Sequence, residues 1–237
     1  MFLEGKNAVV TGGTRGIGLA IAEALARAGA GVAVCGRDNT SVENAVTHLA
    51  KLSKSKVAGK AADVRSSTEV ASFFQYVDGE LGALDILVNN AGVGVFKSTA
   101  ELSVEDWTKT LETNLSGAFY CSKEALPRFR NRGNGYIVNI SSLAGKNAFA
   151  GGAAYNASKF GLNGFSEALM LDHRYENVRV SCVMPGSVDT EFGTGSASGA
   201  EWKIAAADVA DIVLMLLKMP ARTLISRVEV RPSKPRK

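Results

Sequence analysis

The sequence predicts an α/β fold in which a parallel sheet is covered by helices on both faces. Short apolar runs of strand length alternate with longer segments of helical period along the 237 residues. Most of these runs are continuously apolar, which is typical of strands buried on both faces of a parallel sheet. A chain of this length often forms one doubly wound domain. We therefore expect residues 1–237 to form a single domain with a seven-stranded parallel sheet.

The predicted strands follow one another with helices between them. They lie at residues 6–10, 31–35, 56–62, 84–88, 135–140, 177–183 and 225–230. Residues 103–130 and 152–172 are predicted to be helical. In a sheet of this kind, ligands bind in the crevice at the carboxyl ends of the strands.

A glycine-rich turn joins the first predicted strand to the first predicted helix. Residues 11–18 read Thr-Gly-Gly-Thr-Arg-Gly-Ile-Gly, and an apolar stripe of helical period follows. Gly12, Gly16 and Gly18 permit a tight turn and close approach of the backbone to a pyrophosphate at the helix N-terminus. Because 25 glycines produce such patterns easily, the place of the turn between strand and helix decides the interpretation. The turn predicts a Rossmann-type dinucleotide site.

The end of the second predicted strand bears on the choice of cofactor. An acidic side chain there would accept hydrogen bonds from a ribose 2′-hydroxyl, whereas arginine suits a 2′-phosphate. Gly36 stands where the acid is expected, Arg37 follows it, and Arg15 lies in the glycine turn beside the same pocket. These residues favour NADP(H) over NAD(H). The alternatives are that both arginines are solvated surface charges, or that Asp38 rotates inward and takes the role of the acid.

Tyr155 and Lys159 are four residues apart in a predicted helix, which puts both on one face. A cation within a few ångströms stabilises phenolate, so a phenol with an ordinary pKa of about 10 would exchange a proton near neutral pH. The pair is a candidate general acid/base. Taken alone it is better explained by chance, so its interpretation depends on the other motifs.

Further motifs support a functional interpretation of the pair. They are Asp63-Val64, Asn89-Asn90-Ala91-Gly92, Asn114, Ser142 thirteen residues before Tyr155, and Pro185-Gly186 followed by Val188 and Thr190. In order and spacing, these motifs and the glycine turn resemble the short-chain dehydrogenases/reductases, including their 3-oxoacyl-ACP reductase-like members. The resemblance covers nearly the whole chain. It departs at the C-terminus, where many members of the family have Asp-Gly-Gly.

The resemblance implies an NADP(H)-dependent oxidoreductase that interconverts a carbonyl and an alcohol by hydride transfer. Ser142 would bind the substrate oxygen, and Tyr155 would be the general acid/base. Lys159 would hold the ribose hydroxyls and lower the phenol pKa, and Asn114 would position a water. The cofactor-binding residues that it implies are Gly12, Thr14, Arg15, Gly16, Ile17, Gly18, Arg37, Asp63, Val64, Asn90, Ala91, Gly92, Tyr155, Lys159, Pro185, Gly186, Val188 and Thr190.

Several of these residues also have structural interpretations. Ser141 and Ser142 follow a predicted strand, and either is able to satisfy backbone groups of a turn, although the spacing favours Ser142 as the functional serine. Asn114 is alternatively a helix-interior residue bonded to neighbouring carbonyls, and Asp63 a helix cap. Residues 89–92 are alternatively an ordinary turn.

Composition sets limits on function. The formal charge of +4 is mild and mixed along the chain, so we expect no nucleic-acid site, and residues 231–237 are interpreted as a solvated basic tail. Three cysteines, at 35, 121 and 182, are expected to be reduced core residues. No residues have metal-ligand spacing, so we expect no catalytic metal. Without a signal-peptide pattern or a run of roughly 18 apolar residues, we expect a cytoplasmic protein with no membrane partner.

The substrate is not identified by the sequence. Residues 189–202 are rich in Gly and Ser and are predicted to form a short, mobile lid. Phe96, Phe149, Phe192 and Trp202 either line an apolar pocket or belong to the core. Small ketones, aldehydes and 3-oxoacyl thioesters all remain open.

Assembly and the class of function also have alternatives. Residues 103–130 and 152–172 carry more apolar surface than one sheet contact hides, which by resemblance predicts a homo-oligomer, a tetramer or dimer. Burial of both helices within one subunit is the alternative. Besides the oxidoreductase, the sequence permits an inactive dinucleotide-binding regulator or a nucleic-acid binder that uses the basic tail. The intact set of site residues argues against the former.

Overall fold

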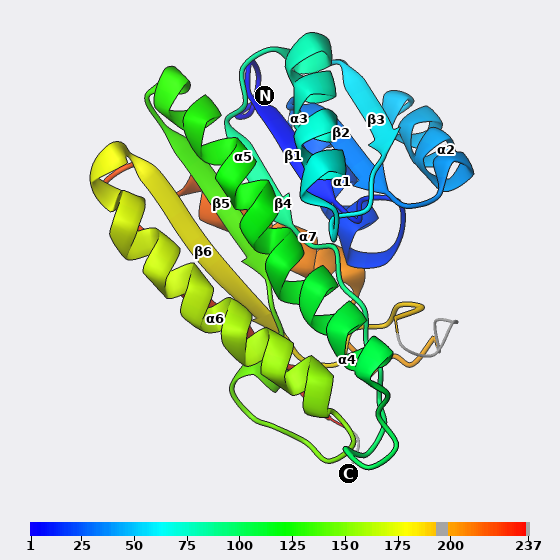
Figure 1. Ribbon diagram of the computed structural model, residues 1–237. Coiled ribbons are helices and arrows are strands. Elements are labelled where there is room, and N and C mark those ends of the chain that lie inside the picture. The colour runs from blue at the N-terminus through cyan, green and yellow to red at the C-terminus, as the bar shows by residue number, and fades with distance from the viewer. Residues whose placement is uncertain (193–198, 236–237) are drawn as a thin grey trace.

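The protein is built on one seven-stranded parallel sheet (Figure 1). The computed structural model describes residues 1–192 and 199–235. The sheet has the order β3-β2-β1-β4-β5-β6-β7, so the chain reverses its direction of winding between β1 and β4. Its strands are β1 (Asn7–Thr11), β2 (Gly31–Gly36), β3 (Val57–Ala61), β4 (Ile86–Asn89), β5 (Gly135–Ile140), β6 (Val178–Pro185) and β7 (Arg227–Val230). Such a reversal opens a crevice at the carboxyl ends of the central strands.

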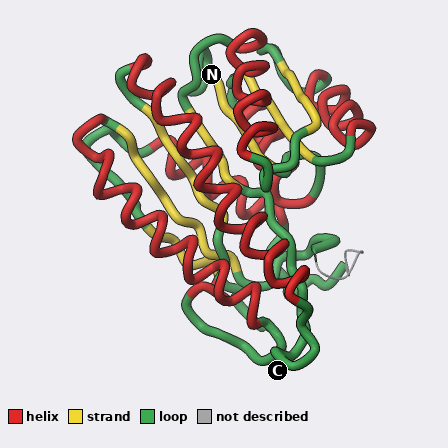
Figure 2. Tube along the Cα trace, in the orientation of Figure 1, coloured by secondary structure: helices red, strands yellow, loops and turns green. Residues whose placement is uncertain are grey.

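Helices cover both faces of the sheet, and Figure 2 shows the strands lying between them. The helices are α1 (Gly16–Arg27), α2 (Asn39–Ala50), α3 (Ser67–Leu81), α4 (Val104–Leu111), α5 (Gly117–Arg132), α6 (Ala153–His173) and α7 (Ala206–Lys218). Apolar side chains of α1, α2 and α7 pack into one core, and those of α3, α5 and α6 pack into a second core on the opposite face. Two separate cores confirm the expected burial of the sheet on both faces.

The predicted fold class and all seven predicted strands are confirmed. Two strands start two residues later than expected, β4 at Ile86 and β7 at Arg227, and the other starts agree to within one residue. The predicted helix over residues 103–130 differs more, because a π-helical turn at Glu112–Ser116 separates α4 from α5. Single π-turns inside helices occur often at functional sites. This one contains Asn114.

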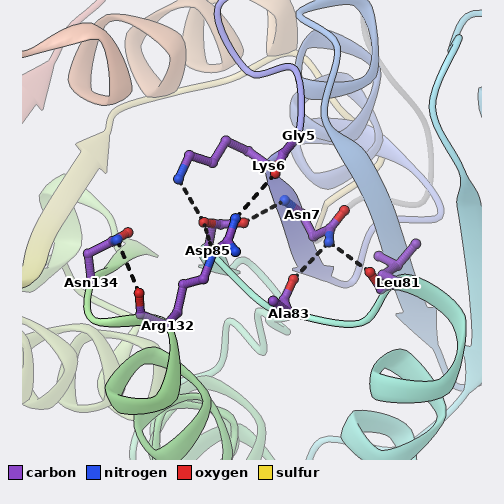
Figure 3. Close-up of polar contacts among 8 residues, drawn as sticks. All are labelled: Gly5, Lys6, Asn7, Leu81, Ala83, Asp85, Arg132 and Asn134. Atoms are coloured by element: carbon purple, nitrogen blue, oxygen red, sulfur yellow. Dashed lines mark hydrogen bonds and ion pairs between the residues drawn. The ribbon is translucent and has the colours of Figure 1, made fainter.

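A buried carboxylate lies immediately before β4 (Figure 3). The side chain of Asp85 is 3% exposed and accepts hydrogen bonds from Lys6 Nζ at 2.8 Å, Arg132 Nε at 3.0 Å and the backbone N–H of Asn7 at 3.0 Å. The Asn7 amide donates to two carbonyl groups at and just after the end of α3. This network joins β1, β4 and α5 at the amino ends of the strands, away from the crevice.

Candidate active site

One cleft of about 1480 Å³ lies at the carboxyl ends of the strands. Its walls come from the glycine turn before α1, the ends of β2, β4 and β5, the start of α6 and the segment after β6. All the predicted cofactor-binding residues line it, and so does Ser142. Asn114 is the one predicted site residue that does not. The fold therefore gathers residues from Gly12 to Thr190 at one place.

The glycine turn has a shape that side chains would prevent. Gly16 has φ +55°, a left-handed conformation that favours glycine. A Cβ on Gly18 would lie 2.2 Å from the carbonyl oxygen of Gly12 and 2.3 Å from Nδ2 of Asn90. Asn90 in turn donates to the carbonyl groups of Thr11 and Gly12 at 3.0 and 3.1 Å. Asn90 thus holds the glycine turn in place, so the predicted motif at residues 89–92 is more than an ordinary turn.

At the end of β2, an acidic side chain at position 36 would collide with the Thr14 side chain in its present position. A Cβ there would lie 2.9 Å from Cγ2 of Thr14. The next acid, Asp38, caps α2, since its Oδ1 accepts hydrogen bonds from the backbone N–H and the hydroxyl of Ser41 at 2.8 and 2.6 Å. Arg37 lines the cleft and has no ion-pair partner within the part of the chain that the structure describes. A cation is therefore available where the predicted 2′-phosphate site lies.

Asp63 lies on the cleft wall but is not the cap of α3. Its carboxylate forms an ion pair with Arg65 at 2.6 Å, and the hydrogen bonds from this guanidinium lower the pKa of the Asp63 carboxyl. Ser66 is the N-cap, because its hydroxyl accepts from the backbone N–H of Glu69 at 3.2 Å. The alternative interpretation of Asp63 as a cap is therefore wrong.

Tyr155 and Ser142 both line the cleft. Ser142 Oγ accepts from the backbone N–H of Ala144 at 3.1 Å, which orients the hydroxyl, whereas Ser141 is buried and bonded to Asn163. Burial raises the pKa of the Tyr155 phenol, and the hydrogen bond with Ser142 lowers it by less. The expectation that Lys159 lowers this pKa is therefore wrong in this structure, because desolvation is the dominant influence on the phenol.

Lys159 lies deep in the same wall. The residue is 4% exposed, and its Nζ donates to the carbonyl oxygen of Ile140 at 2.9 Å and stands 5.8 Å from the centroid of the Tyr155 ring. Burial lowers the pKa of the Lys159 ammonium to about 8. The ammonium group is therefore a cation at neutral pH, but its pKa of about 8 lies only a little above that pH.

Asn114 lies behind the cleft wall. Its side-chain amide both accepts from and donates to the backbone of Val93, at 2.8 and 2.9 Å, and donates to Ser158 Oγ at 2.9 Å. The alternative in which Asn114 bonds to neighbouring carbonyls thus describes part of its contacts, although the partner belongs to the loop after β4. These bonds connect that loop to α6 beside Lys159.

Aromatic rings surround the phenol ring. The rings of Phe96 and Phe192 lie 5.6 and 5.7 Å from that of Tyr155, and Phe149 lies 5.8 Å from Phe96. Phe149, Phe192 and Trp202 line the cleft, as the sequence suggested for a pocket. The contact of Phe96 and Phe192 with Tyr155 itself was not predicted, because the three residues come from distant segments.

The segment after β6 lies over the glycine turn. Glu191 forms an ion pair with Arg15 at 3.3 Å, and the methyl group of Thr190 lies 3.5 Å from the position that a Cβ of Gly16 would take. The predicted lid over residues 189–202 includes 193–198, which lie outside the described residues.

The C-terminal tail is exposed, as expected, but it is not remote from the site. Arg231, Pro232 and Pro235 line the cleft. The cause is the pairing of β6 with β7, which continues in a hydrogen bond of 2.8 Å from the Gly186 N–H to the carbonyl oxygen of Val230 and carries the tail past Gly186. The interpretation of this segment as a mere solvated tail is therefore corrected for residues 231–235.

Three further expectations concern the cysteines, metal ligands and membrane-spanning helices. The cysteines at 35, 121 and 182 are buried and unpaired, as predicted for core thiols. Among residues 1–192 and 199–235, no group of three or more His, Cys, Asp or Glu side chains is placed to hold a metal ion. In the same residues, no helix has the length and apolar character needed to cross a membrane.

The fold and the cleft together define a Rossmann-type α/β protein of the kind that binds dinucleotides. The family model described as short chain dehydrogenase matches residues 6–200. The chain belongs to the short-chain dehydrogenase family, a family of oxidoreductases. The resemblance stated from the sequence motifs is thereby confirmed.

Individual relatives match between 84% and 99% of the chain. It is 37% identical over 204 residues to the 3-oxoacyl-[acyl-carrier-protein] reductase FabG of Chlamydia muridarum, covering 84% of this chain and 82% of that protein. It is also similar to the alcohol dehydrogenase of the archaeon Thermococcus sibiricus complexed with 5-hydroxy-NADP, with a TM-score of 0.92, 29% identity and 98% of each chain covered. A metagenomic short-chain oxidoreductase in complex with NADP gives a TM-score of 0.87 at 36% identity, covering 99% of this chain and 100% of that one.

Proposed function

We propose that this protein, acting as one domain over residues 1–237, is an NADP(H)-dependent oxidoreductase that interconverts a carbonyl and an alcohol. The observation that carries the proposal is that Ser142, Tyr155 and Lys159 line the same cleft as the glycine turn. Two solved relatives contain NADP or a derivative of it, which supports the choice of cofactor. When bound, the nicotinamide supplies or accepts hydride.

The residues of the cleft fit such a cofactor. The glycine turn presents bare backbone at the start of α1, where a pyrophosphate would be held. Lys159 would donate to the ribose hydroxyls, in place of or beside its bond to Ile140. Arg37 would bind the 2′-phosphate, because it lines the cleft just after β2 and has no ion-pair partner among the described residues.

The chemistry of the protein itself would be proton transfer at the substrate oxygen. Ser142 and Tyr155 would both donate hydrogen bonds to this oxygen, and Tyr155 would give it a proton as the carbonyl is reduced. The raised pKa of the phenol suits this direction, because the group keeps its proton at neutral pH. Asn114 would act as a positioning residue through Val93 and Ser158.

The proposal is tested by following the absorbance of NADPH and NADH with a panel of ketones, aldehydes and 3-oxoacyl thioesters. We expect oxidation of NADPH with at least one carbonyl class, and a clear preference for NADPH over NADH. Absence of cofactor oxidation across the panel, with either cofactor, would contradict the proposed function.

Arg37→Gln is expected to weaken NADPH binding about 10- to 100-fold and to leave NADH binding nearly unchanged. A hydrogen bond to a charged group contributes about 1.5 to 3 kcal/mol, and 1.4 kcal/mol is tenfold in affinity. Calorimetric titration with each cofactor measures both constants. The matched control is Arg174→Gln, an arginine beyond the end of α6 at the opposite end of the sheet. Equal losses for NADPH and NADH would show that Arg37 does not bind a 2′-phosphate.

We also propose that the protein is a homo-oligomer whose subunits pair through α5 and α6. Phe119 on α5 and Phe160 on α6 are 44% and 45% exposed, although Leu169 is buried within the subunit. Exposed apolar side chains of this size mark interaction surfaces when they gather on one face. Light scattering tests this, and a solution mass equal to the single chain of 24.9 kDa would refute it.

A further inference from the structure

The rings of Phe96, Phe149 and Phe192, here called the aromatic cluster, form an exposed apolar surface that adjoins the Tyr155 ring. Their exposed fractions are 46%, 46% and 43%. Core aromatic side chains in this protein, such as Phe73 and Phe129, are at most 1% exposed. Large apolar side chains that gather at the surface next to polar groups mark a ligand-binding surface. The aromatic cluster therefore has the character of an incompletely covered binding face.

The cluster is held together by contacts that leave its outer face open. The Phe96 ring meets that of Tyr155 edge-on, at an interplanar angle of 76°, and the Phe192 ring is tilted against Tyr155 at 52°. Rings at these separations attract one another, and a further ring adds to the same kind of contact. A flat or ring-shaped apolar group next to the substrate carbonyl would meet this surface when its oxygen reaches Tyr155 and Ser142.

Two of the cations that line the cleft already have carboxylate partners. Arg231 forms an ion pair with Glu229 at 2.9 Å, and Lys203 forms one with Asp189 at 3.7 Å. Apart from Lys159, which the cofactor ribose would engage, a carboxylate near the reacting carbonyl would have to displace one of these partners to pair with a cation. Arg37, the exposed cleft cation without such a partner among the described residues, lies at the cofactor end. The charge distribution therefore favours an uncharged substrate group beside the aromatic cluster.

Gly94 sets the position of two of the rings. A Cβ on Gly94 would lie 2.7 Å from Cε1 of Phe192 and 2.8 Å from Cζ of Phe96. Since its φ lies outside the left-handed region, alanine is compatible with the backbone. The atoms that it would meet are the far ends of two side chains, which are able to swing away. Gly94→Ala thus displaces both rings without removing either.

We propose that the aromatic cluster selects uncharged ketones that carry a ring beside the carbonyl, with Phe192 and Gly94 as specificity-determining residues. This inference rests on the proposed function. Under this proposal, the preferred substrates are not small aldehydes and ketones, 2-oxo acids or linear 3-oxoacyl thioesters.

The test compares acetophenone, acetone, pyruvate and acetoacetyl-CoA as substrates with NADPH. We expect kcat/KM for acetophenone to exceed that for acetone at least about 100-fold, since apolar contacts of a few methylene groups discriminate by this much. Phe192→Ala and Gly94→Ala should each lower this ratio about tenfold. Phe192→Tyr, which keeps the ring, should retain it within about threefold. The control Gly79→Ala, whose Cβ meets nothing within 4 Å on α3, should leave the ratio unchanged.

Binding is measured separately, by calorimetric titration of acetophenone into Tyr155→Phe with NADPH present. In this Tyr155→Phe background, acetophenone binding that is weakened by Gly94→Ala but not by Gly79→Ala supports the inference even where turnover fails. If no ketone oxidises NADPH, the proposed function fails, and the titration alone decides the inference. If acetone, pyruvate or acetoacetyl-CoA is used as well as acetophenone, or if the ratio is the same in Gly94→Ala and wild type, the inference is wrong while the proposed function stands.

Discussion

Tyr155→Phe is expected to lower kcat for carbonyl reduction about 10²- to 10⁴-fold, the usual contribution of a positioned proton donor. The change removes one oxygen atom and keeps the ring between Phe96 and Phe192. NADPH affinity should therefore stay within about twofold of wild type, because the retained ring preserves the shape of the wall. Steady-state kinetics and cofactor titration on the same preparation measure the two effects.

The matched control is Tyr76→Phe on α3, a tyrosine that stands outside the cleft. It should reduce substrates at the wild-type rate. If Tyr155→Phe also kept that rate, Tyr155 would not be the proton donor, whatever its place in the cleft.

The pH dependence follows from the direction of the phenol pKa. Because burial raises the pKa of Tyr155, the phenol keeps its proton at neutral pH and loses it only as the pH rises well into the alkaline range. The rate of reduction should therefore stay level through neutral pH and fall at high pH, while alcohol oxidation should rise over the same range. In a profile of kcat/KM against pH, Tyr155→Phe should lack this alkaline limb.

Local sequence patterns were sufficient to predict the fold and the position of the cleft. Continuous apolar runs and helical stripes are short-range signals, and parallel strands necessarily bring their carboxyl ends to one edge. The glycine turn and Asn90 therefore meet although 72 to 79 residues separate them along the chain, as the hydrogen bond from Asn90 Nδ2 to Thr11, 79 positions away, illustrates. The N-cap of α3 was also predictable from the sequence, because Ser66 and Glu69 have the spacing of a capping box and Asp63 does not.

Long-range packing and burial could not be predicted in the same way. Phe96, Tyr155 and Phe192 meet only in the folded chain, and no periodic pattern connects them. The pKa of Tyr155 depends on how much water the folded wall excludes, which the spacing to Lys159 does not reveal. The tail at Arg231 approaches the cleft because β7 pairs with β6, a consequence of topology.

Lys159→Met is expected to stabilise the cofactor-free protein at neutral pH while it abolishes efficient turnover. The ammonium has a pKa of about 8 in the folded chain, lowered from 10.5 by burial, so folding disfavours its charged form. A shift of this size corresponds to about 3 kcal/mol at 1.36 kcal/mol per unit. Loss of the bond to the Ile140 carbonyl offsets about 1 kcal/mol of the gain. The expected net increase in unfolding free energy is about 2 kcal/mol.

The pH dependence of the stability difference between Lys159→Met and wild type identifies its cause. Below pH 8 the lysine is charged in both the folded and unfolded chain, and its destabilising effect is complete. Between about 8 and 10.5 the unfolded chain binds more protons than the folded one, so wild-type stability rises with pH relative to Lys159→Met. Urea unfolding at pH 7 and pH 10 should therefore show the advantage of the variant shrinking or reversing. Lys51→Met, at the exposed end of α2, should show no such trend.

The two halves of this prediction test different statements about Lys159. A stabilised variant that no longer reduces ketones means that the buried charge is retained for cofactor and proton chemistry at the expense of stability. If the variant were less stable than wild type at pH 7 and equally so at pH 10, the hydrogen bond to Ile140 would outweigh the desolvation of the charge. If it kept full turnover, Lys159 would have no part in the proposed reaction.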